Sequence, residues 1–166
     1  MLIDSARYLP LLSMSGWLAM FATKHRNMFL GDCMGLVYHL ALVPVVQLLP
    51  GSPEIRFAGY LWLFGDAMLD MASINGAGHA AVWTARMCVH LPAAIWIVGA
   101  SAGMSGAAFF VGIALGAGLF LHALFGPRLA DPKRVLGAFV IPGMTVWLIA
   151  VAAWLGAFTA PAPVSG

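Results

Sequence analysis

The sequence predicts an all-α integral membrane protein, a bundle of about six transmembrane helices joined by short loops. Two observations support this prediction. Of the 166 residues, 62% are hydrophobic and only 8% are charged, whereas a soluble domain carries about 25% charged residues. The apolar residues also fall into six segments near the length of about 20 residues that a membrane-spanning helix needs. We therefore expect a single polytopic domain over residues 1–158, with the lipid bilayer as its main partner.

The six apolar segments follow one another closely along the chain. The first is short, and a polar segment at residues 24–27 separates it from the second. Turn-forming residues at 50–53 and 75–78 interrupt the pattern twice more. Residues 159–166 are small and Pro-rich, which predicts a disordered C-terminal tail. The expected helices run over residues 8–23, 28–49, 57–76, 79–103, 105–125 and 135–158.

The distribution of basic residues predicts the orientation of these helices. With six crossings, one side of the membrane carries Lys24, Arg26, Arg86, Arg128, Lys133 and Arg134, and the other side carries Arg7 and Arg56. Cytoplasmic loops of membrane proteins carry the excess of Lys and Arg. We therefore expect both termini on the non-cytoplasmic side of the plasma (inner) membrane.

Aromatic residues lie near several of the predicted outer helix ends. Tyr and Trp are enriched where a helix meets the membrane–water interface. The sequence therefore predicts an interfacial position for four side chains: Tyr8, Tyr60, Trp62 and Trp154.

Small residues at four-residue spacing predict close helix packing. Gly31 and Gly35 form one such motif, and Gly99 and Gly103 form another. Grooves of this kind let two helix backbones approach closely. The sequence leaves open whether they pack within one bundle or between copies in a homo-oligomer.

Ionisable residues inside the predicted helices define the candidate site. Residues four or seven apart lie on one face of a helix, because 3.6 residues complete a turn. Charged side chains inside a membrane are costly and usually face the bundle interior. Three such pairs share a helix face: Asp32 with His39, Asp66 with Asp70, and Arg86 with His90.

The depths of these groups are compatible with a single polar pocket open to the cytoplasm. At 1.5 Å per residue, one layer lies roughly 5–10 Å from the cytoplasmic helix ends and a second lies about 15 Å deep. The shallower layer contains Asp32, Asp70, Arg86 and His122, and the deeper layer contains His39, Asp66 and His90. We expect Arg86 to pair with one of Asp66 and Asp70, and the other to carry a proton.

The favoured functional prediction is proton-linked transport of a small solute. Asp66, Asp70, Arg86 and Asp32 form the predicted substrate or proton site. A carboxylate that can gain and lose a proton inside the membrane is the component that proton relay or coupling requires. The sequence indicates neither the substrate nor the direction of transport.

Two alternatives remain open: a metal or haem protein, and an accessory subunit of a membrane complex. In the first, zinc in a hydrolase could have His39, His90 and His122 with an aspartate as ligands, or haem iron in a redox protein could have His39 and His90. No His-Glu-x-x-His or Cys-x-x-Cys-His motif supports either cofactor. The chain could also be an accessory subunit of a larger membrane complex. Nucleic acid is not an expected partner, because the net charge is only +2 and no long basic run occurs.

Overall fold

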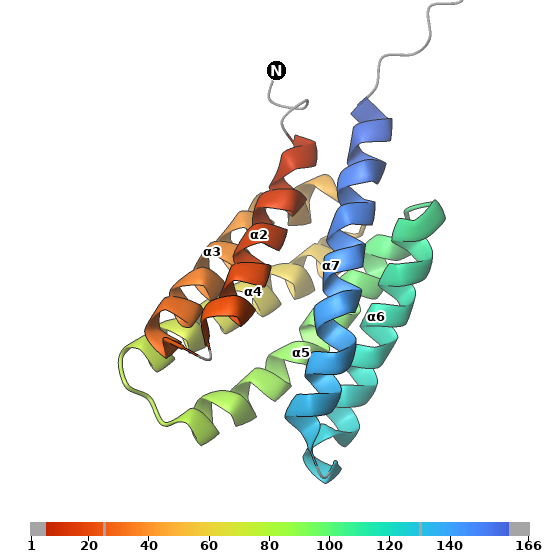
Figure 1. Cartoon of the computed structure of the whole chain (residues 1–166). Coiled ribbons are helices and arrows are strands. Elements are labelled where there is room, and N and C mark those ends of the chain that lie inside the picture. The colour runs from red at the N-terminus through yellow and green to blue at the C-terminus, as the bar shows by residue number, and fades with distance from the viewer. Residues whose placement is uncertain (1–5, 25, 130, 160–166) are drawn as a thin grey trace, which may run out of the picture.

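The computed structural model describes residues 6–24, 26–129 and 131–159, and these residues form six long α-helices and two short 3-10 turns (Figure 1). Each α-helix coincides, within a few residues, with a helix expected from the sequence, so the all-helical fold is confirmed. Of the predicted tail, Thr159 ends the last helix, and residues 160–166 lie outside the described part of the chain. The elements are η1 (Ala6–Tyr8), α2 (Leu9–Lys24), α3 (Met28–Leu48), α4 (Pro53–Ile74), α5 (His79–Ala102), α6 (Gly106–Phe125), η2 (Gly126–Arg128) and α7 (Pro132–Thr159).

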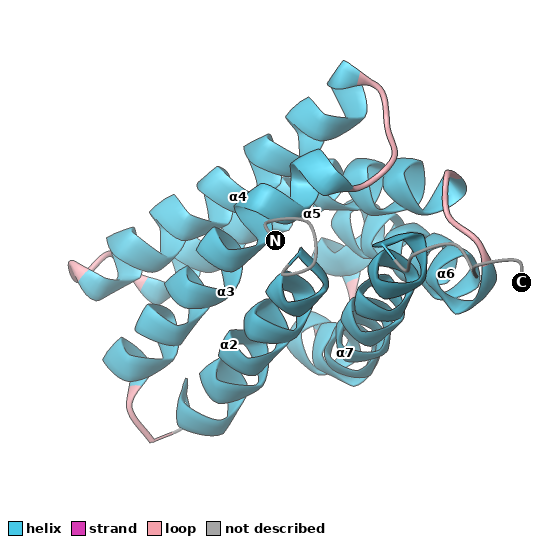
Figure 2. Ribbon diagram, turned by 90° about the horizontal axis from the view of Figure 1, so that it is seen from above, coloured by secondary structure: helices cyan, strands magenta, loops and turns pink. Residues whose placement is uncertain are grey.

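The six helices are arranged as a closed ring. Each helix packs against its neighbours in sequence, and α7 packs back against α2 (Figure 2). The chain runs alternately up and down, so that the α2–α3, α4–α5 and α6–α7 connections lie at the same end of the bundle (Figure 1). We call this the basic end, because Lys24, Arg26, Arg128 and Arg134 lie in or beside these connections.

Local sequence explains where several helices begin. The Asn27 side chain accepts a hydrogen bond from the backbone N–H of Leu30 at 3.0 Å and caps α3. Pro53 occupies the first turn of α4, where its missing N–H costs no hydrogen bond. The Asp131 carboxylate accepts a hydrogen bond from the backbone N–H of Arg134 at 3.0 Å at the start of α7. The breaks between helices therefore follow from capping chemistry.

Within the described residues, four helices are long and apolar enough to cross a membrane. They are α3, α5, α6 and residues 137–157 of α7. Helix α2 has only 16 residues, and α4 has 22 residues but carries Asp66 and Asp70. The outward face of α4 is nevertheless apolar, with exposed fractions of 50% to 70% at Phe57, Leu61, Phe64, Met68 and Met71.

Small residues allow the helices to approach one another within this single chain. A Cβ atom at Gly31 would lie 2.8 Å from the Cα of Lys24 in α2, and one at Gly116 would lie 3.1 Å from the carbonyl oxygen of Ala94 in α5. These glycines therefore face neighbouring helices of the same bundle. Gly31, one of the glycines that the sequence analysis named, thus packs within the bundle, and a homo-oligomer stays a prediction.

Candidate functional site

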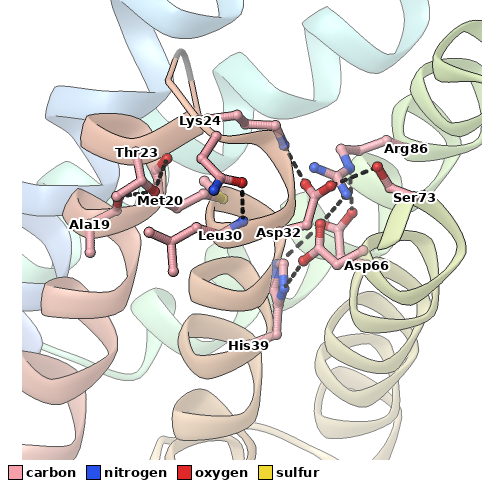
Figure 3. Close-up of polar contacts among 12 residues, drawn as sticks. Ala19, Met20, Thr23, Lys24, Leu30, Asp32, His39, Asp66, Ser73 and Arg86 are labelled. Atoms are coloured by element: carbon pink, nitrogen blue, oxygen red, sulfur yellow. Dashed lines mark hydrogen bonds and ion pairs between the residues drawn. The ribbon is translucent and has the colours of Figure 1, made fainter. Parts of the chain in front are cut away.

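Four ionisable side chains meet inside the ring, and we call them the central cluster: the buried His39 on α3, Asp66 and Asp70 on α4, and the partly buried Arg86 on α5. Nε of Arg86 lies 3.2 Å from Oδ1 of Asp66, and its Nη2 donates a hydrogen bond to Oδ1 of Asp70 at 2.5 Å. Figure 3 shows Arg86 and His39 approaching Asp66 from neighbouring helices. The four-residue spacing of the aspartates brings both carboxylates to the same partners.

His39 bridges the two carboxylates of the central cluster. Its Nε2 lies 3.5 Å from Oδ2 of Asp66, and its Nδ1 lies 3.2 Å from Oδ2 of Asp70. A neutral imidazole carries a proton on only one nitrogen, whereas the imidazolium carries one on each. Because a carboxylate oxygen lies within 3.5 Å of each nitrogen, the nearby negative charge favours the protonated form of His39. The expectation that Arg86 pairs with one aspartate alone is therefore too simple, since both carboxylates have two cationic neighbours.

Asp32 lies next to this cluster and has partners of its own. Nζ of Lys24 lies 3.0 Å from Oδ1 of Asp32, and the Ser73 hydroxyl donates a hydrogen bond to Oδ2 at 2.6 Å (Figure 3). The aspartate is only 1% exposed. Its ion pair links the end of α2 to α3, and its hydrogen bond links α3 to α4. Sequence analysis placed Asp32 in the candidate site but did not identify Ser73 as its partner.

Trp62 is a site residue that the sequence analysis misplaced. Its indole Nε1 donates a hydrogen bond to Oδ2 of Asp66 at 2.8 Å, and the residue is only 3% exposed. The prediction that Trp62 lies at the membrane interface is therefore wrong. The four-residue spacing between Trp62 and Asp66 was the available signal, because it puts both side chains on the inward face of α4.

Three members of the central cluster, His39, Asp66 and Arg86, form part of the wall of a cavity of about 490 Å³. Residues from all six α-helices line this cavity, and its surface is mostly apolar. It reaches the basic end, where its lining includes Lys24, Met28 and His79 at helix termini. Its ionisable wall contains Asp32, His39, Asp66, Arg86 and His90, and its aromatic wall contains Trp17, Phe21, Tyr38, Trp62 and Trp83.

Two further polar groups on this wall have no hydrogen-bond partner among the described residues. They are the Tyr38 hydroxyl and Nδ1 of His90. Tyr38 is 1% exposed and His90 is 7% exposed. Buried polar groups are normally satisfied by protein, water or ligand. Both groups can therefore contribute hydrogen bonds to a molecule inside the cavity.

The histidines are not arranged as the metal hypotheses require. The His90 and His122 rings lie 6.1 Å apart between centroids, whereas both nitrogens of His39 face carboxylates. Across residues 6–24, 26–129 and 131–159, no group of three or more His, Cys, Asp or Glu side chains is arranged to hold a metal ion. A haem or zinc ligand needs an unprotonated nitrogen directed at the metal, and both His39 nitrogens lie within 3.5 Å of a carboxylate oxygen.

Comparisons of the chain with protein-family profiles, with curated proteins and with solved structures find no match. The function must therefore be argued from the bundle and its cavity. Chemically, the cavity combines an apolar, aromatic wall with a charged cluster that includes a histidine. Such a site can bind a small molecule and can bind or release a proton.

Proposed function

We propose that this chain is a six-span integral protein of the plasma (inner) membrane that carries a small solute in exchange for, or together with, a proton. The cavity is the solute site. Asp66, Asp70, Arg86 and His39 supply the proton-binding group and the charges around it, and Asp32 extends this polar wall toward the basic end. The substrate or proton site is thus the set of residues that the sequence singled out, with His39 added to it.

Two considerations support membrane insertion of α2 and α4 beside the four more apolar helices. Helix α4 turns Asp66 and Asp70 inward and leaves large apolar side chains on its outward face, which is the distribution that lipid requires. Helix α2 is about 24 Å long at 1.5 Å per residue. The 3-10 turn η1 directly precedes it and adds to the length of helical chain. In the closed ring, each of these helices packs against two others, as the remaining helices do.

The basic end supports the proposed orientation. Lys24, Arg26, Arg128 and Arg134 lie at this end, and the positive-inside rule puts such an end in the cytoplasm. Both termini would then lie on the opposite side of the membrane. The cavity, which reaches the basic end, would open to the cytoplasm.

The observation that carries the transport proposal is that the central cluster faces the cavity. A purely structural ion pair gains most when it is sealed between helices, since water competes with its contacts. Here Asp66, Arg86 and His39 line a cavity of about 490 Å³. That volume lies within the range of roughly 300–1,000 Å³ that is typical of small-molecule sites. Solute and proton would therefore bind in direct contact with the same charges.

Proton flux in liposomes tests this proposal. The purified protein is reconstituted with a trapped pH-sensitive dye and exposed to a panel of quaternary amines, carboxylates, amino acids and sugars. We expect at least one class of solute to move protons in the wild type, and we expect Asp66→Asn to abolish that movement. Asp131→Asn is the matched control, because Asp131 is exposed and lies outside the cavity.

The proposal fails if no solute class moves protons in wild-type liposomes beyond the level of protein-free vesicles. It also fails if Asp66→Asn and Asp131→Asn are equally active. The first result would leave a packing role for the cluster, as expected of an accessory subunit. The second would remove Asp66 from any coupling mechanism.

A further inference from the structure

We infer that the cavity binds a monovalent organic cation with an aromatic or branched apolar body, and that this cation exchanges for the single proton carried by His39. The inference rests on the proposed transport function and names its substrate class. The juxtaposition that supports it is a charge-balanced set of ion-paired side chains beside an aromatic cavity.

The charges of the ion-paired groups beside the cavity balance when His39 is protonated. Three carboxylates contribute three negative charges: Asp32, Asp66 and Asp70. Lys24 and Arg86, which pair with them, contribute two positive charges. His39 touches two of the carboxylates and supplies the third positive charge when both of its nitrogens are protonated. Loss of that proton leaves one uncompensated negative charge inside the bundle.

An uncompensated buried charge is costly, and a bound cation would restore the balance. Oδ1 of Asp66 and Oδ1 of Asp32 make ion pairs but no aligned hydrogen bond, so both atoms keep acceptor capacity. Both residues line the cavity. Carboxylate oxygens are therefore available to a cation that binds inside the cavity. A bound anion would be repelled, because loss of the His39 proton already leaves one excess negative charge.

The rest of the wall indicates what the body of the cation is like. Trp17, Phe21 and Trp62 line the cavity, and aromatic rings attract cations as well as apolar groups. The hydroxyl of Tyr38 is buried and lacks a partner in the described part of the chain. A small inorganic ion would leave most of this apolar surface unfilled. A cation with aromatic or branched substituents would cover it.

Other titratable groups also face His39 and its surroundings. Helix α2 contributes Lys24, α3 contributes Asp32 and Tyr38, α4 contributes both aspartates, and α5 contributes Arg86, His90 and His79. His122 of α6 lies against His90. His39 is the histidine paired with both Asp66 and Asp70, so it is the group whose proton a cation would replace. The released proton would leave to water at the basic end of the cavity.

Calorimetry with two matched probes tests the inference. Tetraphenylphosphonium and tetraphenylborate have nearly the same shape and opposite charge. The protein is held in nanodiscs of neutral phosphatidylcholine, and titrations in buffers of different ionisation enthalpy count the protons released. We expect the phosphonium to bind with release of close to one proton near neutral pH, and the borate not to compete. In His39→Gln we expect phosphonium binding without proton release, whereas the control His122→Gln should release protons as the wild type does.

The wild-type protein alone provides a second readout if His39→Gln does not fold. A one-for-one exchange requires the phosphonium affinity to fall as pH falls, by up to about tenfold per pH unit. The inference is overturned if the phosphonium does not bind, if it binds without pH dependence or proton release, or if the borate binds more tightly. If other solutes move protons in the liposome assay while the phosphonium does not bind, only the substrate class is wrong. If no solute moves protons there, transport itself is refuted.

Discussion

Gly35 of α3 leaves the space that the Asp70 carboxylate of α4 occupies. A Cβ atom at Gly35 would lie 2.5 Å from Oδ2 of Asp70 and 3.0 Å from its Cγ. The same Oδ2 atom lies 3.2 Å from Nδ1 of His39, one helical turn further along α3. The absence of a side chain at residue 35 therefore lets Asp70 reach both His39 and Arg86.

Gly35→Ala should consequently displace Asp70 and weaken the central cluster. Overpacking of a buried site costs about 1–3 kcal/mol, so we expect a lower melting temperature in detergent. Gly137→Ala is the matched control, because a Cβ atom at Gly137 would meet only Ile141, at 3.9 Å on the same helix. The control should be neutral or slightly stabilising, since alanine favours a helix over glycine. Equal melting temperatures for the two variants would contradict the packing described here.

Arg86→Ala should be among the most destabilising single substitutions. It leaves Asp66 and Asp70 with His39 as their remaining cationic partner, and breaking a buried ion pair costs about 3–5 kcal/mol. Arg128→Ala, at an exposed site, should change the free energy of unfolding by no more than about 0.5 kcal/mol. Thermal unfolding of both variants checks this difference. Adding Asp70→Asn to Arg86→Ala should recover part of the loss, because it removes a carboxylate that would otherwise lack its arginine; no recovery would argue against the pairing.

The hydrogen bond from Trp62 to Asp66 can be tested with two substitutions of buried tryptophans. Trp62→Phe removes the donor to a charged acceptor, a change that costs about 1.5–3 kcal/mol beyond the loss of packing. Trp96→Phe is the control, since the Trp96 indole N–H makes no hydrogen bond to the described residues. Both residues are buried. We expect Trp62→Phe to lower the melting temperature more than Trp96→Phe does, and the reverse order would remove Trp62 from the site.

The proposed orientation has a direct consequence for the chain ends. A C-terminal alkaline phosphatase fusion should be active, because that enzyme folds only outside the cytoplasm, and a C-terminal fluorescent protein that matures only in the cytoplasm should be dark. The opposite pattern would reverse the bundle. It would also open the cavity to the non-cytoplasmic side.

The helices and the shared face of Asp66 and Asp70 could be predicted from sequence because both depend on local periodicity. The place of His39 beside these aspartates could not, because it depends on how α3 packs against α4. Apolar segments of about 20 residues predicted the helix boundaries within a few residues. The four-residue spacing of Asp66 and Asp70 predicted that both carboxylates lie on one helix face. The bond from Ser73 to Asp32 could not be predicted, because it depends on how α3 and α4 rotate against each other. Trp62 was misplaced because the sequence does not show which face of α4 the tertiary structure buries. An interfacial tryptophan and an inward-facing one therefore look alike in the sequence. The number of membrane crossings and the transported solute stay predictions.

The exchange of a cation for a proton depends on one claim: the central cluster holds one exchangeable proton, and His39 carries it. Solid-state NMR of the ¹⁵N-histidine-labelled protein in lipid measures this most directly, because it separates protonated from unprotonated ring nitrogens. The chain has five histidines, and His39→Gln identifies the relevant signals. The account predicts that both His39 nitrogens are protonated at neutral pH without ligand, and that one loses its proton when a cation binds. A neutral His39 with one unprotonated nitrogen in the ligand-free protein would contradict the account.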